Sequence, residues 1–481
     1  MSTSGFVSRI KAQVERGSFN TSDFNVLVLA MCSVILIMLA RLASQLSTWS
    51  THKGLLSYFF EDNSEFILAV TVYLPILLLL ATLTTSSKQG HLTIGALGFL
   101  FGVASWFISY NFTSSARTIF SQLNGFYPMS TGLGDWWSIP DIVGCRDNTG
   151  CARSGGTNGY GIGWRILSPL ANDKIALILG GVMAGYVCYG IAKYAYQMNI
   201  QSASLMVFLS PSMIFSLERG QSDIFLVGLI FIFLSFKKVN AVTSALVTMA
   251  LLAMKPFFVV AFLRDKPKAL RILLLAPIFL LTYLFSMNFS FVDIQNARNS
   301  TLYWPKSQFG VDQLPSLFIQ FFDKKYHVNE IYWQGATSFR LSLVVGLIVF
   351  ALVYAASLKR SLRHLNVLNL DSLELPERNL ILIFSSLYLL MYLSGSEVAY
   401  KTWVAFPILI LSLRRFLELK KRAKPSVIVF MSLILFGGFA IHIWTLRSIG
   451  TFMLAIYCAH VVTYFYKDSF FVSKLTKKST T

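Results

Sequence analysis

Two aspartates lie in a stretch of the chain that is rich in tryptophan, tyrosine and glycine. Asp135 precedes Trp136 and Trp137, and Asp141 follows Pro140. A carboxylate in such a loop can act as a general base toward an acceptor hydroxyl, and a neighbouring indole can stack on a sugar face. Loop aspartates are also often plain solvated acids. The two residues are therefore alternative candidates for one catalytic base.

The second polar cluster consists of Glu218, Arg219, Gln221 and Asp223, and it lies between two apolar runs. An arginine can clamp a phosphate through two parallel hydrogen bonds, and Glu218 or Asp223 can orient it. Charged groups beside apolar runs are costly unless they face a cavity or one another. A purely structural ion pair between Arg219 and Asp223 is the alternative interpretation.

Two lysines complete the set of candidates. Lys255 precedes Pro256 inside an otherwise apolar run, and Lys401 follows Tyr400 in a short turn. A lysine at membrane depth is a functional candidate, although its long side chain can also reach the headgroups. Lys401, supported by Tyr400, can hold an anion, or it is an interfacial lysine beside an aromatic belt residue.

Cations near the membrane surface and acids in an adjacent loop suit a lipid-linked phosphate. Arg219, Lys255 and Lys401 can neutralise such a phosphate while an aspartate activates the acceptor. The sequence has no Walker, Rossmann or HExxH motif and no hydrolase elbow, so nucleotide chemistry and proteolysis have no support. No cofactor is required. The outer acids are able to bind a divalent cation, but no ligand spacing demands a metal.

The elements that position these residues are apolar helices. The chain of 481 residues is 55% hydrophobic and 13% charged, whereas soluble domains are about 45–50% apolar and about 25% charged. A spanning helix needs about 20 mostly apolar residues, so the sequence predicts an all-α polytopic integral membrane protein with about twelve transmembrane helices. The runs are Phe24–Leu42, Phe66–Thr85, Leu92–Tyr110, Ile175–Tyr196, Asp223–Ser235, Ala241–Leu263, Leu273–Met287, Leu341–Leu358, Leu380–Leu393, Thr402–Leu413, Val427–Ile441 and Met453–Phe465, with Ser202–Ser216 shorter and interrupted by Pro211.

The net charge of +19 does not indicate a nucleic-acid partner. The basic residues lie in short segments beside apolar runs, which is the positive-inside pattern of a plasma or inner membrane protein. This pattern places both termini in the cytoplasm and the candidate site on the outer face. We expect one membrane domain over 1–481, with a cytoplasmic linker 359–377, a cytoplasmic tail 467–481, outer loops 113–172 and 288–338, and an outer turn 394–401.

One run does not fit this topology as a single span. Ala241–Leu263 has basic residues on both sides, Lys237 and Lys238 before it and Arg264 after it. A hairpin broken near Lys255-Pro256 removes the conflict. Proline lacks an N–H and clashes with the preceding turn, so a break is expected there. Irregular backbone at membrane depth must be buried in protein or line a wet cavity.

Two of the five cysteines, Cys145 and Cys151, lie close together in the outer loop. An extracytoplasmic face permits a disulfide between them, and two free thiols are the alternative. Cys32, Cys188 and Cys458 lie in apolar runs and are interpreted as small hydrophobic residues.

The segment Glu218–Asp223, followed after an apolar run by Lys255-Pro256, resembles glycosyltransferase family 87. The turn Gly395–Lys401 is similar to a Tyr-Arg turn of that family, with Lys401 in place of arginine. Pro140–Val143 is similar to its aspartate element, although Gly144 and Cys145 stand where a tyrosine is expected. The resemblance implies a GT-C fold, a polyprenyl-phosphate sugar as donor and a catalytic aspartate at Asp141, with Asp135 as the competing position.

The expected function is therefore transfer of a hexosyl or pentosyl group from a polyprenyl-phosphate sugar to a glycan, lipid or glycolipid acceptor at the outer membrane surface. Two alternatives stay open. The first is an O-antigen-type polymerase or ligase, which also acts on lipid-linked glycans. The second is a transporter, a class that usually shows inverted repeats and paired broken helices, whereas this sequence shows one broken segment and no repeat.

Overall fold

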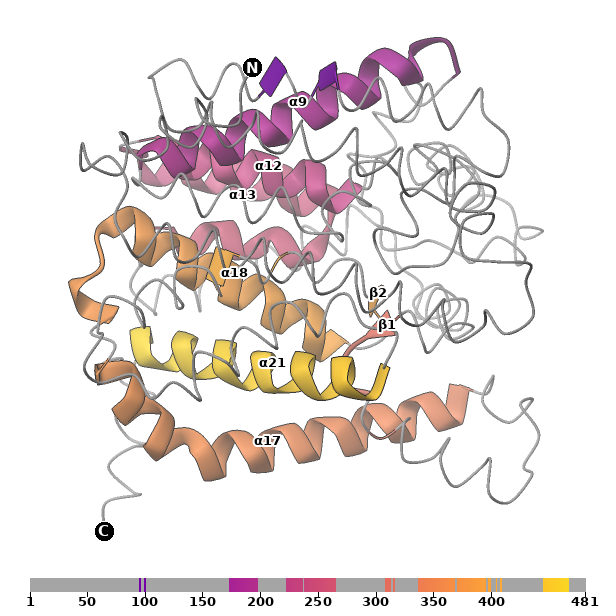
Figure 1. Ribbon diagram of the computed structural model, residues 1–481, viewed down its shortest axis with the longest axis vertical. Helices are drawn as coiled ribbons and strands as arrows, with labels where there is room; N and C mark the ends of the chain where they lie inside the picture. Colours follow the sequence, from indigo (N-terminus) through magenta and orange to yellow (C-terminus); the bar gives the residue numbers. More distant parts are fainter. Residues whose placement is uncertain are drawn as a thin grey trace, which may run out of the picture.

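The computed structural model describes about a third of the chain (Figure 1). The described residues are 95–96, 99–100, 173–197, 222–236, 238–264, 308–312, 315, 336–367, 370–394, 397–398, 404, 407–408 and 444–466. Outside them lie several predicted features: the first two apolar runs, the runs 273–287 and 427–441, Ser202–Ser216, the outer loop 113–172 and the tail 467–481.

This part of the chain is helical apart from one pair of two-residue strands. The helices are α9 (Asp173–Gln197), α12 (Ser222–Ser235), α13 (Ala241–Met254), the 3₁₀ helix η4 (Pro256–Leu263), α17 (Ala336–Val367), the 3₁₀ turn η7 (Leu370–Ser372), α18 (Leu375–Ser394) and α21 (Trp444–Tyr466). The strands are β1 (Gln308–Phe309) and β2 (Glu397–Val398), which pair antiparallel. Figure 1 shows the long helices lying alongside one another, with the strands at one end.

Helices α9 and α12 run parallel and approach closely at glycines. Tyr186 contacts Phe225, and further along Tyr194 contacts Phe231, which fixes the common direction. A Cβ atom on Gly190 would lie 2.9 Å from the Gly228 carbonyl oxygen. Small residues that let helix backbones approach are typical of packing in apolar surroundings, where van der Waals contact replaces the hydrophobic effect.

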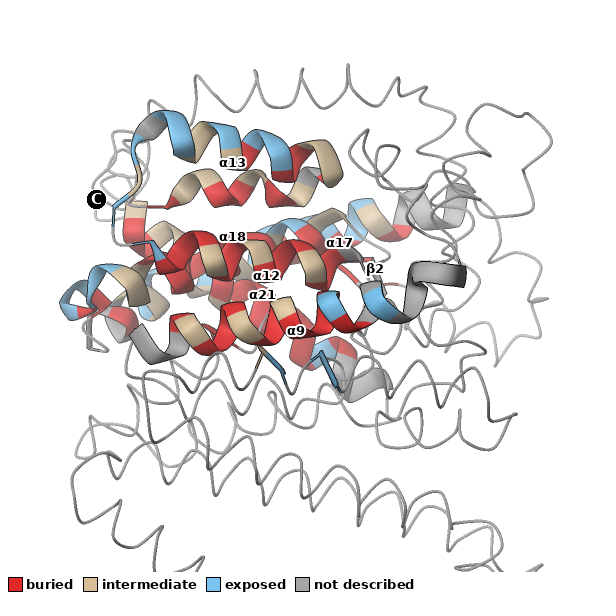
Figure 2. Ribbon diagram, turned by 90° about the horizontal axis from the view of Figure 1, so that it is seen from above, coloured by how far each residue is buried: buried red, intermediate tan, exposed pale blue. Residues whose placement is uncertain are grey.

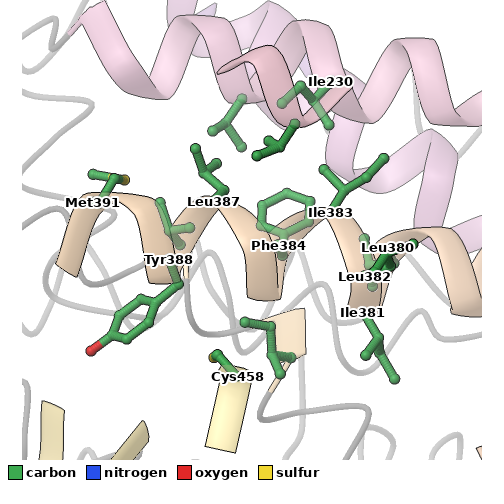
Figure 3. Close-up of a cluster of buried hydrophobic side chains, with 14 of the residues drawn as sticks. Ile230, Leu380, Ile381, Leu382, Ile383, Phe384, Leu387, Tyr388, Met391 and Cys458 are labelled. Atoms are coloured by element: carbon green, nitrogen blue, oxygen red, sulfur yellow. The ribbon is translucent and has the colours of Figure 1, made fainter. Parts of the chain in front are cut away.

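Helix α18 forms the centre of the described core. The unbroken run from Asn379 to Tyr388 is buried, so this stretch of the helix has no face for water. Phe384 packs against Phe231 of α12, with 5.0 Å between the ring centroids, and Figure 3 shows its neighbours pointing toward α12 and α21. A helix that is apolar on all sides belongs in a core or a membrane.

Helix α17 differs from α18 because it contacts the rest of the described protein mainly through α21. Its outer face exposes apolar side chains, among them Val344, Ile348 and Leu352 (Figure 2). The segments Ser342–Leu362 of α17 and Ser448–Tyr466 of α21 are, among the described residues, the two that are long and apolar enough to cross a membrane. An exposed apolar stripe on such a helix needs lipid or protein to cover it.

The contacts also order the two ends of the bundle. The Tyr194 hydroxyl near the end of α9 donates to the Pro376 carbonyl near the start of α18, so these helices are antiparallel. The Tyr464 hydroxyl near the end of α21 donates to Asp371 of η7, 2.6 Å away. We call this the linker end, and the end with β1 and β2 the strand end. The segment 359–377 and the tail were predicted to lie on the same side of the membrane, and both connect to helices at the linker end. The segments 288–338 and 394–401 were predicted to lie on the opposite side, and both connect to helices at the strand end.

The coarse prediction of a helical chain is confirmed for the described residues, and two of their helices are long and apolar enough to span a membrane. Several predicted boundaries lie close to the ends of the described helices. The outer loop 113–172 was expected to end one residue before α9 begins at Asp173. Pro376 was expected at the end of the linker, and α18 begins at Leu375. The linker itself is more ordered than expected, because α17 continues as a helix through its basic residues to Val367. The number of spans and the GT-C fold stay predictions.

Candidate functional site

A buried ion pair joins two of the predicted site residues. The ammonium Nζ of Lys255 lies 2.8 Å from Oδ1 of Asp223, and the two side chains are 6% and 3% exposed. The Lys255 side chain is therefore enclosed by protein and directed at a carboxylate. Both residues were candidates from the sequence, but their pairing with each other was not predicted, and the alternative pair of Arg219 with Asp223 involves a residue outside the described part of the chain.

Local sequence explains why Lys255 lies between two helices. Helix α13 begins at the N-cap Asn240, whose side chain accepts a hydrogen bond from the Thr243 N–H at 2.7 Å. It ends at Lys255, whose own N–H still donates to the Leu251 carbonyl. Pro256 disfavours helical backbone in the residue before it, and Lys255 is extended with φ −151° and ψ 142°. Proline then suits the first position of η4, since its missing N–H has no helical partner there.

Asp223 lies in the first turn of α12. A carboxylate is favoured at a helix N-terminus because the unpaired N–H groups give that end partial positive charge. The residues that follow, Ile224, Leu226 and Val227, are fully buried and fix the helix in the core. Removing one member of a buried ion pair leaves an uncompensated charge and costs about 3–5 kcal/mol of folding free energy. The pair thus ties the break after α13 to the start of α12.

A second cation, Arg264, joins the end of η4 to the end of α12. Its guanidinium donates to the carbonyl oxygens of Phe233 and Phe236 at the end of α12. It also lies over the Phe233 ring, 4.8 Å from the centroid. The carbonyls at a helix C-terminus carry partial negative charge, so a cation is favoured there. Because Lys255 meets the start of α12 and Arg264 meets its end, α13 and η4 run in opposite directions along it.

The predicted broken hairpin is thereby confirmed, with its turn at Lys255-Pro256. Both arms are short. Helix α13 has 14 residues and is about 21 Å long at 1.5 Å per residue. Helix η4 has 8 residues and is about 16 Å long at about 2.0 Å per residue. Neither is as long as the roughly 30 Å thickness of a bilayer core, and the ion pair lies at the turn between them.

The strand end brings together two predicted outer segments. Gln308 pairs with Val398 and Phe309 with Glu397, which joins the loop 288–338 to the turn 394–401. The Val311 N–H donates to the Tyr392 carbonyl of α18 at 2.9 Å. Since α12 and α18 run in opposite directions, Asp223 lies toward the end of α18 that leads into β2. The ion pair and the strands therefore share the strand end.

The structure adds one acid that the sequence did not single out. Asp312 follows β1 and is 1% exposed. The backbone before it is pressed against α17, since a Cβ on Gly346 would lie 2.0 Å from the Val311 carbonyl oxygen. The available signal was weak: the run Gly310-Val-Asp-Gln313 contains a turn residue and an acid but no apolar periodicity.

The other predicted site residues lie outside the described part of the chain. They are Asp135, Asp141, Glu218, Arg219, Gln221, Tyr400 and Lys401, together with the cysteines Cys145 and Cys151. Two of the three cysteines that were interpreted as small hydrophobic residues, Cys188 and Cys458, are described, and both are free and buried. Among the residues that the structure describes, no group of three or more histidine, cysteine, aspartate or glutamate side chains is arranged to hold a metal ion.

Comparison of the chain with models of known protein families, with curated proteins and with solved structures gives no match.

Proposed function

We propose that this chain is a membrane glycosyltransferase that moves a sugar from a polyprenyl-phosphate donor to a glycan, lipid or glycolipid acceptor at the outer membrane surface. The observation that carries the proposal is the Lys255 ammonium, held inside protein at the tip of a broken apolar hairpin. An intramembrane lysine is expensive and marks a functional pathway by default. A lipid-linked phosphate is a suitable ligand, because its charge stays near the headgroups while its chain stays in apolar surroundings.

In this proposal, Arg219, Lys255 and Lys401 bind the donor phosphate, and Asp141 is the base, with Asp135 as the alternative. Glu218, Gln221 and Tyr400 orient these groups. The acceptor hydroxyl gives its proton to the aspartate as its oxygen bonds to the anomeric carbon. The bond between that carbon and the phosphate oxygen breaks, and polyprenyl phosphate leaves with the electron pair. Cations near the leaving phosphate stabilise the charge that develops on it.

The direct test is an incubation of the purified protein with a panel of polyprenyl-phosphate sugars, followed by analysis of lipid and glycan products. Asp141→Asn should lower turnover by about 10²–10⁴-fold and leave donor affinity nearly unchanged, because a general base acts mainly in the transition state. Asp135→Asn should be milder, and Glu374→Gln, exposed near the linker end, should have no effect. If no polyprenyl-phosphate sugar in the panel is consumed, the proposal is wrong. Consumption of a lipid-pyrophosphate glycan instead would favour the O-antigen-type class.

One structural observation also favours a second candidate. Charges at a broken helix occur at the substrate sites of secondary transporters, and the pair at the hairpin tip fits that description. Uptake of a labelled solute into vesicles containing the protein, with no sugar released from polyprenyl phosphates, would favour transport. Release of the sugar without uptake would exclude it.

A further inference from the structure

We infer that Asp223 is the positioning residue of this site, because its carboxylate holds the Lys255 ammonium, charged, at the hairpin tip where the donor phosphate binds. The inference rests on the proposed function. The carboxylate of Asp223 repels a phosphate directly, yet we expect it to be needed for phosphate binding. Asp223 acts through Lys255 and is not expected to touch the reacting atoms.

The geometry separates what fixes the lysine backbone from what fixes its charge. Hydrogen bonding to Leu251 and the following proline fix the backbone of Lys255. The four-carbon stem of a lysine is flexible and carries a compact, strongly hydrated charge, so the backbone does not determine where the ammonium lies. The 2.8 Å contact with Asp223 fixes the position of the ammonium. The backbone of Asp223 is held in place by packing, since the residue stands in the first turn of a helix whose next residues are in the core.

Two opposite effects follow from removing the carboxylate. A phosphate would lose a repulsive neighbour, which strengthens binding. The buried ammonium would lose its counter-ion, and such a group either gives up its proton or turns toward water. Loss of the repulsion strengthens binding only if a cation stays at the hairpin tip. Loss of the counter-ion leaves no cation there, because the lysine becomes neutral or turns away. The loss therefore dominates, and an asparagine at position 223 should weaken phosphate binding.

The first arm of the test measures the lysine without any ligand. The full-length protein in detergent is treated with an amine-methylating reagent, and the modification of Lys255 is followed by mass spectrometry against Lys238, which is exposed. Lys255 should react slowly in the wild type and in Asp223→Glu. In Asp223→Asn its rate should approach that of Lys238. Equal protection of Lys255 in Asp223→Asn and the wild type would overturn the inference.

The second arm measures binding of farnesyl phosphate, a short prenyl phosphate, with farnesol as the uncharged control. Asp223→Asn should weaken binding by about 10- to 100-fold, the effect of losing one charge-assisted contact, and Asp223→Glu should restore most of it. Exchanging the charges, Asp223→Lys with Lys255→Asp, keeps a pair that supports folding but moves the ammonium onto α12. This variant should fold and still bind poorly.

The outcomes separate the two claims. If the wild type binds farnesyl phosphate and Asp223→Asn binds it equally well or more tightly, Asp223 is not a positioning residue, and the proposed function stands. If the charge-exchanged protein binds as the wild type does, the location of the ammonium is irrelevant and the inference fails. If the wild type binds farnesyl phosphate no better than farnesol, the proposed function fails, while the methylation rates still report whether Asp223 holds Lys255.

Discussion

Single charged residues stand out because most of the described side chains are apolar. Lys255 and Arg264 both belong to the hairpin, yet they are stabilised differently: Lys255 by a carboxylate, and Arg264 by backbone carbonyls and an aromatic ring. An arginine suits the second role because its planar group donates several hydrogen bonds in a fixed geometry.

Arg264→Met should destabilise the protein by about 3 kcal/mol, because two hydrogen bonds from a charged donor to buried carbonyls are lost. The measurement is the unfolding midpoint in detergent. Lys238→Met is the matched control, since Lys238 is exposed and surface substitutions usually change stability by less than about 0.5 kcal/mol. Equal midpoints for the two variants would show that the contacts of Arg264 contribute nothing.

Gly346→Ala tests the close contact between α17 and the turn after β1. Replacing glycine by alanine inside a helix normally stabilises it by about 0.5–1 kcal/mol. Here the new Cβ would meet the Val311 carbonyl, so we expect a lower unfolding midpoint and weaker attachment of the turn. Ala351→Ser, exposed on the same helix, is the control. A stabilised Gly346→Ala protein would mean that the turn does not press on α17.

The hairpin is the element in which sequence and structure can be compared most directly. Proline after lysine predicts the break, because its steric effect is local and does not depend on the rest of the fold. The contact between Lys255 and Asp223 could not be predicted, since 31 residues of mostly apolar sequence separate Lys255 from Asp223 and only packing brings them together. The basic charges after Leu358 suggested a linker, but lysine and arginine are good helix formers, and α17 extends through them.

The strand pair provides a test of how the elements meet at the strand end. Gln308 and Val398 are direct partners, and opposed antiparallel residues have Cα atoms about 4.5–5.5 Å apart, within the range for a disulfide. In a cysteine-free background, Gln308→Cys with Val398→Cys should form a crosslink under mild oxidation, seen as a mobility change after cleavage between them. Gln308→Cys with Ser372→Cys, at the linker end, should not. A crosslink in the second pair alone would contradict the arrangement of the ends.

At the scale of the whole molecule, helix directions and the charge pattern make one combined prediction about topology. The linker end carries Ser372, which is exposed, and the basic segments beside it belong in the cytoplasm under the positive-inside rule. In intact cells, a single cysteine at Ser372 should be protected from an impermeant thiol reagent, and one at Ser307 should react. The reverse result would place the ion pair on the cytoplasmic face.

The order of α12 and the hairpin along the chain has a consequence for synthesis of the protein. A hairpin with a lysine at its tip is a poor candidate for entry into lipid by itself, since a charge in the membrane needs a partner. Its anchors are Asp223 and the last carbonyls of α12, and α12 is synthesised before the hairpin. When Lys255 and Arg264 leave the ribosome, both of their partners have already been made. We therefore expect a substitution at Asp223 to lower the yield of membrane-inserted protein as well as its binding activity.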